Sequence, residues 1–232
     1  MNKLIDNYND TAILINAVHV AIDRYEKKGN NVGLSTTKNI PQRYRLAILE
    51  MDYVFDKNKL IRRYRNESIN KIARDYLITT VSTLDAYLEE VYAVLLKKKD
   101  PTFTDKQIDK EVRESWRDEK IRKFMVNEAN ILVRDGKLTT PDMAFDRYQE
   151  FRILRHAVVH NDNILSNKHI AQLNDLNSRL PDKYKEIGYT MLESEFIDKN
   201  KIILDNKLVF GTRKWAFEFL AFIAVGLEEG NS

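Results

Sequence analysis

The chain has 232 residues, no cysteine and a formal net charge of +3, from 38 basic and 35 acidic side chains. Disulfides and thiolate-held metals are therefore excluded, a reducing cytoplasm is the expected compartment, and the charge alone does not indicate a nucleic-acid-binding protein. Only seven glycines and four prolines occur among 43% hydrophobic and 31% charged residues, a composition that favours helices over strands and turns.

A membrane location is not expected from the sequence. A membrane-spanning helix needs about 20 predominantly apolar residues. The longest apolar run covers residues 219–227 and ends at two glutamates, and residues 1–6 lack the hydrophobic region of a signal peptide. We therefore expect a cytoplasmic protein with no membrane partner.

Three long helices are predicted in the first hundred residues. The first covers residues 10–28, where Gly29 is placed to end it, and the second follows Pro41. The third covers residues 68–98 and is the expected central core helix, because its apolar side chains recur at intervals of four and three residues. The residues expected to face the core are Ile13, Ala17, Val20, Ala21 and Tyr25 in the first helix, Leu46, Leu49, Tyr53, Leu60 and Ile61 in the second, and Leu77, Val81, Leu84, Leu88, Val91 and Leu95 in the third.

Capping residues mark the next two helical regions. Thr104 is the expected N-cap of a charged helical region that continues to about residue 133 and is broken at residues 135–136. Thr140 and Pro141 then occupy the N-cap and first positions of a helix that should end near His160.

The C-terminal part is predicted to contain a helix, a hairpin and a last helix. Ser166 caps the helix over residues 168–180, residues 202–210 form a short hairpin around Asp205 and Asn206, and Thr212 caps the last helix. The aromatic residues of that last helix are expected in the core or in a dimer contact: Trp215, Phe217, Phe219 and Phe222.

The most informative feature is an arginine within the apolar face of the helix that begins at Pro141. On a helix of ~3.6 residues per turn, Arg155 falls in the middle of this face. An unpaired guanidinium is costly there, so it needs a carboxylate, a phosphate or a wet crevice. Asp85 and Glu89 are the candidate carboxylates if the arginine is structural. The apolar residues of the face are Ala144, Tyr148, Phe151, Val158 and Val159.

Two histidines follow this arginine. His156 and His160 are four residues apart and share one face, with Arg152 one turn earlier. Arg155 and His160 point about 140° apart on a regular helix. They can act on one small group only if the helix frays, or if another element or a second copy of the chain completes the site.

The residue types suit phosphodiester cleavage. A histidine titrates near neutrality and can move a proton, whereas an arginine carries a permanent charge matched to phosphate oxygens. In RNA the neighbouring 2′-hydroxyl can be the nucleophile, so this reaction needs no metal. His160 in the last helical turn is also placed near the negative end of the helix dipole.

These residues resemble the signature of the HEPN domains (higher eukaryotes and prokaryotes nucleotide-binding). That signature is an arginine, commonly followed by a polar residue, and then a histidine about five positions later near a helix end. Arg155, His156, His160 and Asn161 match it, and the segment 83–88 with Asp85 is similar to the family's second conserved helix.

The resemblance implies a helical bundle that dimerises through the motif helix. With the hairpin expected from the sequence itself, the predicted fold is an all-α, up-and-down helical bundle with a small β-hairpin near the C-terminus. Residues 1–232 would form a single helical domain, with an N-terminal extension over 1–65, a HEPN-like core over 66–180 and a hairpin and helix over 181–232. Many members are metal-independent endoribonucleases of toxin–antitoxin, phage-defence or RNA-processing systems. The expected partners are an RNA substrate, a second copy of the chain and an antitoxin or activator protein, with no cofactor.

The resemblance also implies roles for particular residues. Arg155 and His160 would be catalytic in a site composed across the dimer, and His156 would assist them. Arg152 and Asn161 are the candidate substrate-binding residues. The possible supporting acids are Asp85 and Glu89.

Other interpretations of the same residues remain open. The protein could be a non-catalytic HEPN module that binds RNA, a nucleotide or a partner protein, with His160 only capping its helix. His156 and His160 could instead bind zinc, which requires further ligands. His19 and His169 are expected to be structural or solvated.

Basic and aromatic residues alternate in two N-terminal segments, 43–45 and 62–65, as they do on RNA-contacting surfaces. Residues 41–75 contain nine lysines and arginines against five acidic residues. The alternative is a solvated helix face with its tyrosines packed inward.

Overall fold

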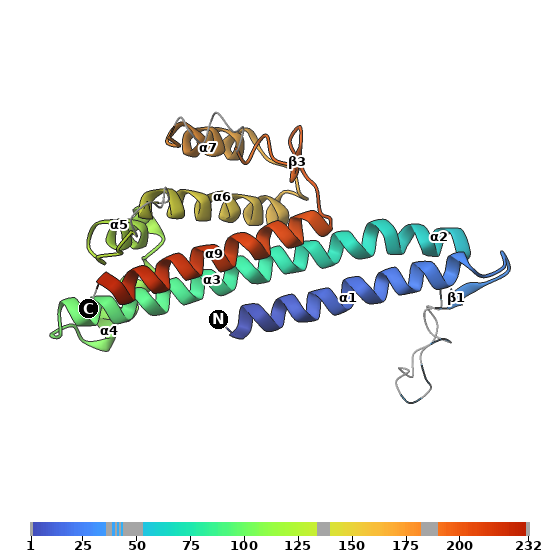
Figure 1. Cartoon of the computed structure of the whole chain (residues 1–232), viewed down its shortest axis with the longest axis horizontal. Helices are drawn as coiled ribbons and strands as arrows, with labels where there is room; N and C mark the ends of the chain where they lie inside the picture. The colour runs from blue at the N-terminus through green and yellow to red at the C-terminus, as the bar shows by residue number, and fades with distance from the viewer. Residues whose placement is uncertain are drawn as a thin grey trace.

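The computed structural model describes residues 2–35, 39, 41, 43, 53–133, 140–181 and 190–230. The expected all-α fold with a small hairpin near the C-terminus is confirmed. The helices lie in layers (Figure 1): α1 (Asn2–Glu26) on one side, α3 (Ile69–Lys99) beside α9 (Asn206–Gly230) in the middle, then α6 (Pro141–His160), and α7 (Asn167–Ser178) outermost.

The predicted central helix is confirmed as α3, which continues α2 (Lys57–Arg62) and a π-helical segment, η2 (Arg63–Ser68). Four of its expected core residues, namely Leu77, Val81, Leu84 and Leu88, are fully buried, and the remaining two are partly buried. α3 packs against α1, α6 and α9, so its apolar faces join the layers into one core.

The first helix is longer than predicted and buries a different stripe. It begins at Asn2 instead of residue 10, and Ile13 and Val20 are 65% and 59% exposed. The buried side chains recur mainly every seven residues, at Leu4, Thr11, Val18 and Ile22. Apolar residues occur on several sides of this helix, so the sequence period does not select one face, and packing against α3 does.

The predicted second helix is wrong at residues 53–56, whereas its end is confirmed: residues 57–61 are helical, with Leu60 buried and Ile61 partly buried. Tyr53 lies in extended chain and is half exposed, and β2 (Val54–Asp56) pairs antiparallel with β1 (Gly33–Ser35). The helix α2 begins only after Asp56, whose carboxylate accepts from the Lys59 backbone N–H at 2.8 Å. The earlier expected core residues of this segment, Leu46 and Leu49, lie outside the described residues.

The charged region after Thr104 is two helices instead of one. Thr104 forms a capping box with Gln107 at the start of α4 (Asp105–Arg113), as its N-cap role predicted. The helix then stops, and a 3₁₀ turn, η3 (Arg117–Glu119), leads into α5 (Lys120–Asn127). Glu119 adopts a left-handed conformation with φ of 56°, which breaks the helix. The break expected at residues 135–136 falls outside the described residues.

The C-terminal hairpin exists but was predicted at the wrong residues. It consists of β3 (Ile197–Asp198) and β4 (Lys201–Ile202). Asp205 caps α9, because its carboxylate accepts from the Leu208 backbone N–H at 3.1 Å. Aspartate favours both turns and helix N-caps, so the local sequence does not distinguish these two roles. Thr212 is therefore a buried residue within α9 and does not cap it.

Candidate functional site

The helix α6 carries the candidate residues, and its predicted limits are confirmed. Thr140 caps it by accepting from the Met143 backbone N–H at 3.2 Å, Pro141 is its first residue and His160 its last. One face packs on α9, where the ring of Phe151 stacks on Trp215 with centroids 4.0 Å apart. The helix continues to His160, so of the alternatives considered for joining Arg155 and His160, fraying of the helix before His160 does not occur.

Arg155 is half-buried in this packed helix. Its Nε atom is buried and has no hydrogen-bond partner among the residues that the structure describes. Within that same part of the chain, no carboxylate forms an ion pair with its guanidinium. The charge of Arg155 is therefore left for water or a ligand to satisfy, which is costly for a structural arginine.

The two acids considered as partners of Arg155 are engaged elsewhere. Asp85 on α3 accepts from the Tyr148 hydroxyl and lies 3.1 Å from Nε of Arg152. Glu89 accepts from Nε1 of Trp116 at 2.6 Å, and the Arg152 guanidinium lies 3.8 Å from the centre of the Trp116 ring.

This arrangement ties α6 to α3 and to the segment after α4. Burial, followed by the charge of Asp85, raises the pKa of Tyr148 well above its ordinary value, so its hydroxyl keeps the proton that it donates. Arg152, Asp85 and Glu89 are thus held in contacts that stabilise the fold.

Three histidines lie together at the C-terminal end of α6. His156 Nδ1 is 3.1 Å from His169 Nε2, and the ring centres of His156 and His160 are 4.7 Å apart. His169 belongs to α7 and is only 5% exposed, whereas His156 and His160 are exposed. His169, expected to be structural or solvated, is therefore part of the cluster; its position three residues after the N-cap Ser166 indicates a capping role but not the contact with His156.

The electrostatic surroundings favour neutral imidazoles in two of these histidines. Burial lowers the pKa of His156, and His160, Lys168 and Arg155 lower it further. Burial also lowers the pKa of His169, followed by the effect of His156 and Lys168. Positive groups surround His156, so a bound phosphate would be the counter-charge that the cluster lacks.

The chain leaves α6 through a tight left-handed turn. The backbone N–H groups of Asn161 and Asn163 both donate to the Ala157 carbonyl, at 2.9 and 3.3 Å, and Asp162 and Asn163 have φ of 49° and 66°. The Asn163 carbonyl then accepts from the Ile202 backbone N–H at 2.8 Å. The β-hairpin thereby fixes the end of the helix on which His160 stands, with Asn161 next to it.

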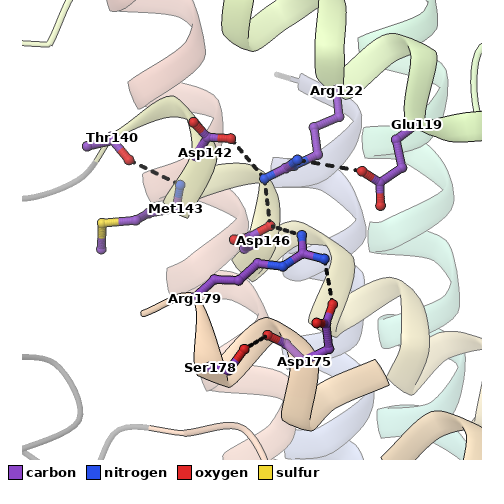
Figure 2. Close-up of polar contacts among 9 residues, drawn as sticks. All are labelled: Glu119, Arg122, Thr140, Asp142, Met143, Asp146, Asp175, Ser178 and Arg179. Atoms are coloured by element: carbon purple, nitrogen blue, oxygen red, sulfur yellow. Dashed lines mark hydrogen bonds and ion pairs between the residues drawn. The ribbon is translucent and has the colours of Figure 1, made fainter. Parts of the chain in front are cut away.

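The N-terminal half of α6 holds a second polar cluster that the sequence analysis did not anticipate (Figure 2). Arg122 from α5 lies 2.9 Å from a carboxylate oxygen of Asp142 and 2.9 Å from one of Asp146, and 3.5 Å from Glu119. Arg179, after α7, lies 3.6 Å from Asp146 and pairs with Asp175.

Buried carboxylates are the centre of this cluster. Burial raises the pKa of Asp146 even though Arg122 and Arg179 oppose the shift. One turn later Glu150 is 2% exposed, pairs with Arg147 at 2.8 Å, and its pKa is likewise raised by burial. Paired charges around Asp146 thus join α6 to η3, to α5 and to the end of α7.

A zinc site gains no support from the geometry. No group of three histidines and carboxylates among the described residues is arranged to hold a metal ion. The His156 and His160 pair therefore lacks the further ligands that zinc requires in that part of the chain. None of the described helices is both long and apolar enough to span a bilayer.

The basic and aromatic segment 62–65 is largely engaged within the protein. Arg63 pairs with Glu67 at 3.1 Å, Arg65 pairs with Glu26, and Tyr64 stacks on Tyr25 with ring centres 6.3 Å apart. These contacts favour the structural interpretation of the segment. The corresponding residues Tyr44 and Arg45 lie outside the described residues.

Comparison of the chain with protein-family models, with curated proteins and with solved structures finds no match. The function is therefore inferred from the chemistry of the side chains at the C-terminal end of α6 and in the first turn of α7.

Proposed function

We propose that the protein is a metal-independent endoribonuclease of the HEPN type, with its site at the C-terminal end of α6. The observation that carries the proposal is Arg155, whose Nε is buried without a partner in the described structure beside a cluster of three histidines. A phosphate bound there would satisfy the guanidinium and the positive surroundings of His156 together.

The reaction follows from these groups. His160 accepts the proton of the RNA 2′-hydroxyl, the 2′-oxygen attacks the adjacent phosphorus, and the bond from phosphorus to the 5′-oxygen breaks. The leaving 5′-oxygen takes up a proton from water, and His160 returns its proton to solvent. Arg155 stabilises charge on the phosphoryl oxygens, and His156 donates to the same phosphate. The products are a 2′,3′-cyclic phosphate and a 5′-hydroxyl.

A second copy of the chain completes this site in the proposal. Because α6 is regular to its end, Arg155 and His160 of one chain point about 140° apart. Two motif helices that meet would bring Arg155 of one chain to His160 of the other. Val159 and Ile164, which flank His160 and are 36% and 46% exposed, supply apolar surface for this contact.

The family resemblance at Arg155, His156, His160 and Asn161 supports the assignment and a toxin, defence or RNA-processing role, with an antitoxin or activator as regulator. The alternative is a non-catalytic module that binds RNA, a nucleotide or a partner protein. The separation of Arg155 from His160 within one chain favours it, because a single copy could bind phosphate without completing the catalytic pair.

The test is RNA digestion by the full chain in EDTA, with the new ends mapped. The wild type is expected to leave 2′,3′-cyclic phosphates, and His160→Ala to lower the rate by roughly 10²- to 10⁴-fold with its Tm unchanged, since His160 is exposed. His19→Ala is the matched control, because His19 is an exposed histidine on α1. RNA binding without cleavage by the wild type would favour the module instead.

A further inference from the structure

The first turn of α7 fixes the protonation pattern of His169. The backbone N–H of His169 donates to Ser166 Oγ, and the Ser166 backbone N–H donates to His169 Nδ1, each at 3.3 Å. A ring nitrogen that accepts a hydrogen bond from a backbone amide carries no proton of its own. In neutral His169 the single ring proton is therefore on Nε2.

The direction of the next hydrogen bond follows from this. His169 Nε2 lies 3.1 Å from His156 Nδ1, so His169 donates and His156 Nδ1 accepts. The single proton of neutral His156 is consequently on its Nε2. One backbone amide thus determines the tautomer of two histidines in succession.

We propose that His169 is a positioning residue for the ribonuclease site, which holds His156 in the tautomer whose only N–H is on Nε2. This inference rests on the proposed function. It divides the work between the two exposed histidines: His156 is a neutral donor that binds the phosphate, and His160 is the group that moves the proton. His169 itself is too deeply buried to touch RNA.

The groups around His156 agree with this division. Burial lowers the pKa of His156, and His160 and Arg155 on α6 and Lys168 on α7 lower it further. Burial, followed by His156 and Lys168, likewise lowers the pKa of His169. Loss of the partner of His169 Nε2–H would be costly, because it would leave a buried hydrogen-bond donor unsatisfied. The contact between α6 and α7 therefore depends on this bond.

The capping box of α4 shows how the bond between His169 and His156 can be tested while the capping box of α7 is kept. In α4 the same capping box uses glutamine, and the Thr104 backbone N–H donates to Gln107 Oε1 at 2.8 Å. His169→Gln can therefore keep the box and still offer an amide N–H to His156. His169→Glu also keeps the box, but a carboxylate can only accept.

The experiment is ¹⁵N NMR of the histidine rings in the full chain, which reports the protonated nitrogen of each imidazole. In the wild type and His169→Gln, His156 Nδ1 is expected to be unprotonated. In His169→Glu, His156 Nδ1 is expected to be protonated, with its titration moved to higher pH. A wild-type His156 that carries its proton on Nδ1 overturns the inference, whether or not the variants fold.

RNA cleavage supplies the second readout. The pH–rate profile is expected to shift to higher pH in His169→Glu and to stay in place in His169→Gln. Ser166→Ala is the structural control: it removes a capping hydroxyl but keeps the backbone N–H, so it lowers stability without moving the profile. A profile unchanged in His169→Glu overturns the positioning role. If the wild type cleaves no RNA, the proposed function fails, whereas the NMR result still judges the tautomer.

Discussion

The two ends of α6 differ in whether their charged side chains have partners of opposite charge. At its N-terminal end, Asp142, Asp146 and Glu150 each face an arginine within 3.0 Å. At its C-terminal end, Nε of Arg155 has no hydrogen-bond partner among the described residues, and the charged groups that shift the pKa of His156 are all basic. Both ends are packed into the same layers of helices, so the difference does not come from exposure alone.

In the proposed function, this difference distinguishes the residues that hold the fold together from the residues of the site. Paired buried charges join helices in one geometry and are costly to break, whereas the half-buried guanidinium of Arg155 has no such partner in the described structure.

The largest expected effect on stability is at the paired end. Arg122→Ala leaves Asp146, whose side chain is 9% exposed, with only Arg179 at 3.6 Å. Loss of one partner of a buried pair leaves an uncompensated charge, so the free energy of unfolding should fall by about 3 kcal/mol. Urea unfolding monitored by circular dichroism measures it.

Two further variants test whether that loss comes from the pairing. Arg179→Ala removes a more exposed partner of the same carboxylate and should cost at most about 1 kcal/mol. In the double variant Arg122→Ala, Asp146→Ala the stranded carboxylate is gone, so part of the stability should return. If the effects of Arg122→Ala and of Asp146→Ala, each measured alone, simply add up in the double variant, the account of a coupled cluster is contradicted.

A smaller effect is expected from pH, with opposite signs at the two ends. The pKa values of His156 and His169 are lowered from 6.5, so the unfolded chain takes up protons first and the free energy of unfolding should fall as pH drops below 6.5. The pKa values of Asp146 and Glu150 are raised from 3.8 and 4.5, so their protonated forms favour the native state, and their contribution to stability is lost as pH rises above those values.

Unfolding by urea, repeated from below pH 3.8 to above pH 6.5, checks both signs. The loss of stability on the acid side of 6.5 should become smaller in His169→Gln, which removes one of the two titrating imidazoles. A loss of the same size in this variant would mean that other groups cause it.

Much of the fold could be predicted from local sequence signals. Thr140 with Pro141 set the start of α6, Ser166 set the start of α7, and the spacing of Leu77, Leu84 and Leu88 set the buried face of α3. These signals work because caps and helical periodicity involve residues that are close in the chain.

The errors arise where a signal has two physical meanings. Asp205 was read as a turn residue, although it caps α9, and the apolar residues of α1 allow more than one inward stripe. In both cases a distant partner in the fold decides between local possibilities.

The same limit applies to the candidate site. The pattern from Arg155 to His160 could be read from the chain because it lies on one helix. His169 could not be placed beside His156, because that contact depends on α7 folding back along α6. The pairing of Asp85 with Arg152 instead of Arg155 likewise depends on the rotation of α6 against α3.

The most direct test of the central claim is Arg155→Met, with cleavage and unfolding measured on the same preparation. The account predicts that RNA cleavage falls by roughly 10²-fold or more, while the free energy of unfolding is unchanged or rises by up to about 1 kcal/mol. Arg152→Met, one turn earlier, should instead destabilise by about 2 kcal/mol, because it strips Asp85 of its guanidinium partner. If Arg155→Met destabilises the protein as Arg152→Met does and leaves cleavage intact, Arg155 is a structural residue and the site lies elsewhere.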